Sequence, residues 1–359
     1  MKHRPGPIAI LAVAVVVVFG LAAFSLVRNG PQFFGAVEDG QKAVAVATAL
    51  ADDLRTLDGV EAVELRAPVI EVDAHVEVIV TVREAFSAAD RVQVAEKTRV
   101  AFDAPQLESR EKSLRILQGG TAIFEQSTFD LSKQVLAERF RDWAAVEAAT
   151  RSPLRLAIPG ADAEYQYTAT GSSEATIRSW VHNYAAIAAT QAPVTTSSAD
   201  VAWQLPGIRS IGRIPTRAEL DLLTAIIATV PPVSASGPVD EAAGVIIWAS
   251  SDTASTLPLT VRVVYIGDDH HLTTARSHAR EAISVARSVV DSGMPDVAYI
   301  YEARFHGAGV DQGRFTTGVC KGNINITPVD REWFAQLEDS GIRFGSSVTP
   351  GFCLSSTTG

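Results

Sequence analysis

The chain has 359 residues and a formal net charge of −10 at pH 7, with 47% hydrophobic and 20% charged residues. The length suffices for two or three domains, and the composition supports a buried core and excludes a wholly disordered chain. The negative charge excludes nucleic acid as a partner bound through its phosphates, because like charges repel.

Residues 8–27, IAILAVAVVVVFGLAAFSLV, form an apolar run of twenty residues without a charged side chain. As a helix this run is about 30 Å long, which matches the hydrocarbon core of a bilayer. Lys2 and Arg4 precede the run and Arg28 follows it, and this basic flank favours a cytoplasmic N-terminus. We therefore expect residues 1–28 to form a cytoplasmic stub and a transmembrane anchor that contacts the lipid bilayer.

A cleaved signal peptide is the alternative for residues 8–27. The run is longer than the usual apolar region of roughly 7–15 residues, and Leu21-Ala22-Ala23 is a poor substitute for a cleavage site. Both interpretations place the chain from residue 29 onward outside the cytoplasm. That part carries 28 basic and 41 acidic side chains, hence −13. We expect protein, cation or polymer partners for so acidic an ectodomain.

After a short tether, residues 41–118 predict the order α-β-β-α-β. Within it, residues 72–83 alternate apolar and polar side chains over twelve positions, which is typical of a strand with one buried face. The valines and Ala74 lie on the buried face, and Asp73, His75, Glu77, Thr81 and Arg83 lie on the other. The elements are a helix over 41–57, strands over 60–66 and 72–83, a helix from Ser87 to about Phe102 and a strand over 113–118.

The same order returns twice along the chain, followed by a short tail. The second copy has a leading strand over 121–126, a helix over 130–148, strands over 154–158 and 163–170, a helix from Ser173 and a strand over 200–205. The third has a helix opened by the capping-box pattern of Thr216 and Glu219, strands over 245–250 and 257–266, a helix and a strand over 296–305. The tail has a strand over 314–320 and a helix over 330–337.

This α-β-β-α-β order resembles the split βαβ, or ferredoxin-like, arrangement. The resemblance covers order and spacing over about 270 residues and no diagnostic motif, so it implies a fold and no family. We expect an α+β protein in which the transmembrane helix precedes three tandem ferredoxin-like units. Their predicted bounds are residues 29–120, 121–206 and 207–359, the last with a C-terminal extension.

The stretch GDDHHLTTARSHAR, residues 267–280, holds three of the seven histidines. A helical zinc pair needs histidines four residues apart, but the positions four residues after His270 and His271 hold threonine and alanine. His271 and His278 share a helix face, yet lie about 10 Å apart along the axis. The spacing therefore predicts no metal site. The residues that a metal site would use are His270, His271, His278 and, beyond the following strand, His306.

We expect this stretch to open an ordinary helix. Asp268 or Asp269 at its start would stabilise the positive end of the helix. The predicted buried stripe is Leu272, Ala275, Ala279, Ile283, Ala286 and Val290.

Other motifs give no catalytic assignment. The glycine-rich run over 306–315 connects two predicted strands and is expected to be a flexible hairpin, because a dinucleotide fingerprint would have to open a helix. No nucleophile elbow, Walker loop or zinc-protease motif is present. Trp143, Trp180, Trp203 and Trp248 are expected in the core, and Trp333 is expected to be the most exposed tryptophan.

The two cysteines of the chain are Cys320 and Cys353. A cysteine pair in an exported domain predicts a disulfide, here closing a loop of 33 residues and worth about 3–4 kcal/mol. Free buried thiols or a redox pair are the alternatives, although the C-x-x-C spacing of a redox pair is absent.

We expect a single-pass, membrane-anchored, extracytoplasmic binding or scaffolding protein of the bacterial cell envelope. Only six of its 31 basic residues are lysines, a bias associated with GC-rich bacterial genomes. We expect a protein partner in the envelope, no nucleic acid, no cofactor and no catalytic residue. The alternatives are an envelope-located metal-dependent hydrolase that uses the candidate histidines, and an architectural subunit of a membrane complex.

Overall fold

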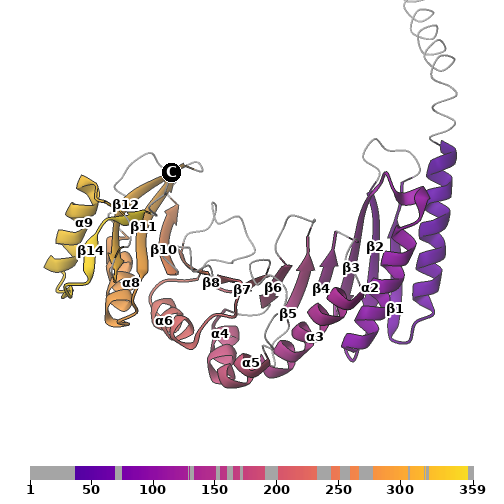
Figure 1. The fold of residues 1–359 in the computed structure, drawn as a ribbon, viewed down its shortest axis with the longest axis horizontal. Coiled ribbons are helices and arrows are strands. Elements are labelled where there is room, and N and C mark those ends of the chain that lie inside the picture. Colours follow the sequence, from indigo (N-terminus) through magenta and orange to yellow (C-terminus); the bar gives the residue numbers. More distant parts are fainter. Residues whose placement is uncertain are drawn as a thin grey trace, which may run out of the picture. The chain divides into compact units, whose positions relative to one another are not determined.

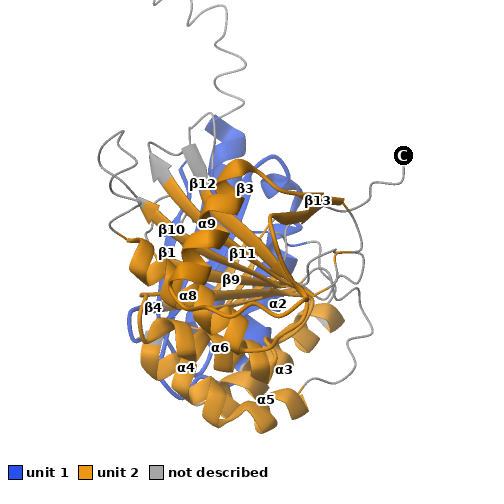
Figure 2. Ribbon diagram, turned by 90° about the vertical axis from the view of Figure 1, so that its left-hand side faces the viewer, with its two compact units in different colours: residues 1–121, 127–131 blue, residues 122–126, 132–359 orange. Residues whose placement is uncertain are grey.

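The structure is a computed structural model that describes residues 37–68, 75–127, 129, 133–150, 154–159, 165–169, 173–190, 201–232, 244–250, 259–266, 278–305, 308–318, 320 and 323–354. These residues belong to two compact units (Figure 2). Unit 1 contains the described residues up to 121 and those of 127–131, and unit 2 contains those of 122–126 and 132–359. The chain is a mixed α/β protein. Its partition into three domains at residues 120 and 206 stays a prediction.

Unit 1 has the predicted order of elements. Its first strand is antiparallel to the second, and the second is parallel to the third. The parallel pair is in register from His75 opposite Glu111 to Val82 opposite Gln118. The elements are a helix over residues 37–55, β1 (Val60–Arg66), β2 (His75–Val82), α2 (Ala88–Phe102), the 3₁₀ turn η1 (Pro105–Leu107) and β3 (Glu111–Gln118).

The alternation predicted for β2 is confirmed where the strand is described, except at Ile79, which is buried on the face of His75 and Thr81. Val76, Val78 and Val80 are fully buried, and they form the core of unit 1 together with Val82. His75 and Thr81 are partly exposed on the opposite face. The position of the buried face therefore followed from the sequence alone, whereas residues 72–74 lie outside the described part of the chain.

Unit 2 continues with the same alternation of hairpins and helices. Figure 1 shows α3, α4, α6 and α8 along one side of its strands. The strands are β4 (Thr121–Gln126), β5 (Leu154–Ile158), β6 (Tyr165–Ala169), β7 (Val201–Leu205), β8 (Ile208–Ile211), β9 (Gly244–Ser250), β10 (Leu259–Ile266), β11 (Val297–Phe305), β12 (Ala308–Thr317) and β14 (Val348–Pro350). The helices are α3 (Lys133–Thr150), α4 (Ser173–His182), α5 (Tyr184–Thr190), α6 (Arg217–Ile227), α8 (Ala279–Asp291) and α9 (Pro328–Asp339).

The pairing of the strands differs from the expected ferredoxin-like arrangement. In a split βαβ unit, another strand lies between the two parallel strands. Here β2 pairs directly with β3, and in unit 2 the strands that α3, α6 and α8 connect are also direct parallel neighbours. Antiparallel hairpins such as β5–β6 and β9–β10 alternate with these crossovers. The order of elements is the same for both arrangements, so it could not distinguish them.

Tryptophan and tyrosine side chains form much of the core of unit 2. Trp143, Trp180 and Trp203 are buried as predicted, and Trp203 stacks on Tyr167 with ring centroids 4.3 Å apart. The prediction for Trp333 is wrong, because this side chain is also buried. It lies against Gly313 of β12, where a Cβ atom would overlap it, and its ring is 4.9 Å from that of Tyr301.

Helix α8 begins at Ala279, about ten residues after the predicted caps Asp268 and Asp269, which lie outside the described residues. Its buried residues are Ala282, Val285, Ala286 and Val289. Only Ala286 belongs to the predicted stripe. The helix carries two adjacent apolar rows, and the row that packs against β10 and β11 is not the predicted one.

The glycine-rich run connects two antiparallel strands, as predicted, but most of it is itself strand. β12 begins at Ala308 and pairs with β11 from Phe305 opposite Ala308. Only 306–307, between the strands, lie outside the described residues. The expected flexible hairpin is therefore wrong over residues 308–315, which belong to β12.

A disulfide joins Cys320 to Cys353 with a Cα–Cα distance of 5.6 Å, which confirms the predicted pairing. The bond lies beside a two-stranded sheet of β13 (Asn323–Asn325) and β15 (Phe352–Leu354), in which Cys353 is opposite Ile324. The C-terminal segment is thus tied to the chain both covalently and by backbone pairing.

None of the helices in the described part of the chain is long and apolar enough to cross a membrane. The apolar run over 8–27 lies outside that part.

Candidate functional site

The structure describes one of the four candidate metal ligands. His270, His271 and His306 lie outside the described residues. The ring of His278 stacks on Tyr265 with centroids 4.1 Å apart, and its Nδ1 lies 3.8 Å from Glu281 Oε2. Among the residues with a described position, no three histidine, cysteine or acidic side chains gather in a metal-binding group.

Unit 1 contains a pocket of about 670 Å³, a size typical of small-molecule sites. It lies where β2 and β3 begin and α2 ends. Charged side chains of both signs dominate its wall. The lining residues are His75, Asp103, Glu108, Arg110, Glu111, Lys112, Ser127 and Phe129.

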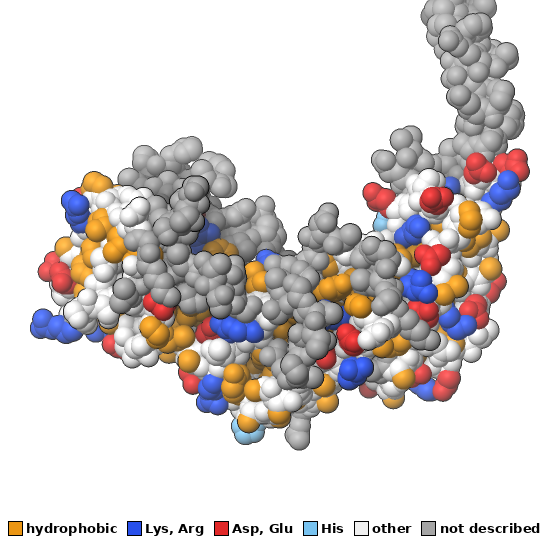
Figure 3. Space-filling view, viewed as in Figure 1, with side chains coloured by type: hydrophobic (Ala, Val, Ile, Leu, Met, Phe, Trp, Pro, Cys, Tyr) orange, Lys and Arg blue, Asp and Glu red, His pale blue; other side chains and the backbone are white. Residues whose placement is uncertain are grey.

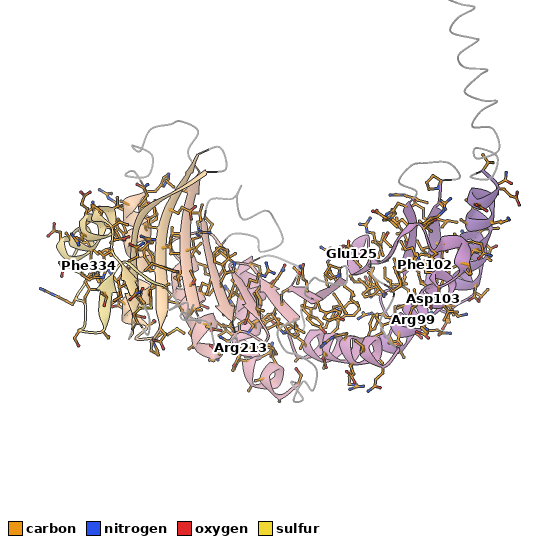
Figure 4. All side chains as sticks on the ribbon, turned by 45° about the horizontal axis from the view of Figure 1, so that its top comes forward. Arg99, Phe102, Asp103, Glu125, Arg213 and Phe334 are labelled. Atoms are coloured by element: carbon orange, nitrogen blue, oxygen red, sulfur yellow. A yellow bond between two sulfur atoms is a disulfide. The ribbon has the colours of Figure 1, made fainter. Side chains whose placement is uncertain are left out.

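The C-terminal end of α2 supplies one side of this pocket. Lys112 Nζ donates a hydrogen bond of 2.8 Å to the carbonyl of Phe102, and Arg99 donates one of 2.9 Å to the Asp103 carboxylate. Figure 4 labels Arg99, Phe102 and Asp103 on this stretch of the chain. Cations here offset the negative end of the helix dipole, so Lys112 has a structural role beside any role in binding.

An apolar contact borders the charged wall. The rings of Phe102 and Phe129 meet edge to face with centroids 4.7 Å apart, and both side chains are buried. Phe129 also lines the pocket. The pocket therefore offers a ligand an aromatic surface beside side chains of both charges.

Three side chains from the two parallel strands meet at the edge of the pocket. His75 Nε2 lies 2.7 Å from Ser113 Oγ, within hydrogen-bond distance. On the other side of the ring, His75 Nδ1 lies 3.6 Å from Glu111 Oε2. The register explains the grouping: His75 is opposite Glu111, and Ser113, two residues further along β3, projects from the same face.

The same face of the sheet continues as an ion-pair network. Glu77 of β2 lies 3.1 Å from Arg66 and 3.4 Å from Arg115, and its carboxylate is largely buried by these partners. Arg66 also pairs with Glu64, and the hydrogen bond that it donates to Glu64, together with the two negative charges, raises the pKa of the Arg66 guanidinium. Acidic and basic side chains are likewise interleaved over the face of unit 1 visible in Figure 3.

Unit 2 also contains buried charges that face an opposite charge. Arg262 lies 2.7 Å from Glu302 and 5.2 Å from the ring centre of Trp248. Arg314 forms two hydrogen bonds to Asp330, which is fully buried. Such paired charges hold α9 and the strands in register.

Comparison with protein-family models, with curated proteins and with solved structures finds no match. A function for this chain therefore has to be argued from its own sites.

The sequence analysis placed His75 on the polar face of its strand but missed its partners. The signal was present: His75 and Glu77 on one strand, and Glu111 and Ser113 on another, each have the two-residue spacing of a strand face. The parallel pairing of the two strands was needed to bring them together.

Proposed function

We propose that the chain is a single-pass, membrane-anchored, extracytoplasmic binding or scaffolding protein of the bacterial cell envelope. In this proposal residues 8–27 span the bilayer, the N-terminus is cytoplasmic, and both units lie outside. The length of the apolar run and the basic residues beside it support the anchor and its orientation.

The observation that carries the proposal is the Cys320–Cys353 disulfide. Disulfides persist in oxidising compartments and are rare in the reducing cytosol. The two sulfurs are joined across 33 residues, and Cys353 is fully buried. A bond built into the fold in this way supports a location outside the cytoplasm.

The pocket of unit 1 and the net charge of the ectodomain support a binding role. The pocket presents both charge signs and an aromatic surface, which suits a ligand with polar and apolar parts. The charge of −13 over residues 29–359 disfavours contact with anionic lipid headgroups and favours a protein or cationic partner.

Location and thiol state can be tested together in membranes from cells that express the full chain. We expect the protein to stay in the pellet after alkaline carbonate washing and to keep Met1. We also expect protease added outside the cytoplasmic membrane to degrade residues 29–359, and a thiol reagent to modify neither cysteine before reduction. A soluble product that begins near Ala23, or two modifiable thiols, would contradict the proposal.

A further inference from the structure

We propose that Ser113, His75 and Glu111 form a nucleophile, a general base and an orienting carboxylate that hydrolyse activated acyl esters at the pocket of unit 1. The proposal goes beyond binding or scaffolding, since it assigns a reaction to a site that needs no metal and no cofactor. It rests on the geometry of three side chains and on the pocket that two of them line.

The two nitrogens of His75 face different partners. Nε2 lies 2.7 Å from Ser113 Oγ, and Nδ1 faces the Glu111 carboxylate at 3.6 Å. A proton on Nδ1 is favoured by the nearby carboxylate and leaves the Nε2 lone pair to accept the serine hydroxyl. This is the relationship by which a histidine activates a serine, and the acid–base distance is often looser before substrate binds.

The parallel strands fix this geometry. Glu111 and Ser113 are two residues apart on β3, so they project from one face and flank the histidine that β2 contributes opposite Glu111. The neighbouring positions Val76 and Leu114 are fully buried and anchor the strands from the other face. Side chains on paired strands are held more closely than side chains on loops.

A substrate can reach the group from the pocket. His75 and Glu111 line the pocket, the His75 side chain is 43% exposed, and Ser113 is half-buried. Phe129, Arg110 and Lys112 line the same pocket, although Lys112 projects from the other face of β3 and hydrogen-bonds the Phe102 carbonyl.

The proposed reaction is hydrolysis of an ester through an acyl-serine, and water is the only other reactant. Ser113 Oγ bonds to the carbonyl carbon, its proton passes to His75 Nε2, and the ester C–O bond breaks as that proton passes to the leaving alcohol. Water then attacks the acyl-serine, gives a proton to Nε2 and releases the carboxylic acid, while Ser113 regains its proton. General-base assistance contributes about 10²–10⁴-fold, so we expect esters with good leaving groups to react and amides to resist.

The test uses full-length protein in detergent micelles and p-nitrophenyl acetate as the substrate. We expect Ser113→Ala and His75→Gln to lower the protein-catalysed rate by about a hundredfold or more, and Glu111→Gln by about tenfold. The control is Glu64→Gln, which changes a carboxylate on the ion-paired part of the same unit and should leave the rate unchanged. Equal rates for the wild type and Ser113→Ala would overturn the proposal.

A second measurement requires no variant. Wild-type protein mixed briefly with the ester and then acidified should carry one acetyl group, which peptide mass spectrometry should place on Ser113. A fluorophosphonate probe should label the same residue. Label on other residues only, or no label, would overturn the proposal, and neither result bears on where the protein lies in the cell.

Discussion

Trp333 lies against the backbone of β12 at Gly313, and this contact determines how closely α9 approaches the sheet. A side chain at position 313 would occupy the volume that the indole fills. The glycine is therefore required by its neighbour, which lies twenty residues further along the chain. The sequence places Trp333 in a short C-terminal helix, so it was expected to be exposed, and no local pattern links it to Gly313.

Gly313→Ala should lower the free energy of unfolding by about 1–3 kcal/mol, because the new methyl group overlaps Trp333 and forces α9 away from β12. Urea unfolding followed by tryptophan fluorescence measures the effect. Gly293→Ala is the matched control: its added Cβ meets no described atom within 4 Å, and only its left-handed backbone opposes it, at a cost of about 1 kcal/mol. A larger loss for Gly293→Ala would contradict this assignment.

Asp330 should make the C-terminal part of unit 2 sensitive to acid. Burial raises the pKa of its carboxyl, but hydrogen bonds from Arg314 and Thr327 outweigh burial and lower the pKa below the ordinary value of 3.8. The stability gained from ionised Asp330 is therefore fully present above about pH 4 and is lost as the pH falls through the lower, folded-state value. Urea unfolding between pH 5 and pH 3 should show a smaller loss of stability for Asp330→Asn than for the wild type.

Strand β2 illustrates what can be read from a sequence at the level of an element. A period of two over twelve residues identified the strand and its buried face, because one residue of slippage would have exposed every valine. It could not identify the neighbours of the strand. The grouping of His75 with Glu111 and Ser113 depends on β2 pairing in parallel with β3, and that pairing is decided by the crossover through α2.

The two faces of β2 should respond very differently to substitution. Val78→Asp places an unpaired charge at a fully buried position and should lower the free energy of unfolding by about 3 kcal/mol or more. His75→Gln, on the partly exposed face, should change it by less than about 1 kcal/mol. Circular dichroism during urea unfolding measures both variants. Similar losses for the two would show that both faces of the strand lie in the core.

Helix α8 shows a second limit at the same scale. The period of a helix fits two adjacent rows of apolar side chains equally well. One row contains Ile283 and Val290, and the other contains Val285 and Val289. Burial of Val285 and Val289 reflects contact with β10 and β11, which no local pattern contains. The existence of the helix was predictable, and the direction of its apolar face was not.

For the whole molecule, the disulfide is the clearest agreement between sequence and structure. Cysteine count and the expected location were enough to predict it, because no third cysteine competed for the bond. Reduction should loosen residues 323–354, at a cost of about 3–4 kcal/mol to that segment, and leave unit 1 unchanged. Hydrogen exchange read by mass spectrometry should show faster exchange in β13, β15 and α9 alone. Faster exchange in β2 and β3 would contradict this localisation.

The direct pairing of chain neighbours in unit 2 has a consequence for how such a protein forms and changes. From β5 to β11, each strand pairs with the strands before and after it, so residues close in sequence come together, and local contacts of this kind speed folding. In the proposed topology, each hairpin with its helix can join the growing sheet as the chain emerges on the far side of the membrane, without waiting for the C-terminus. For the same reason, one hairpin with its helix can be gained or lost without changing how the remaining strands pair. We therefore expect homologues of different lengths to differ by whole hairpin-and-helix repeats.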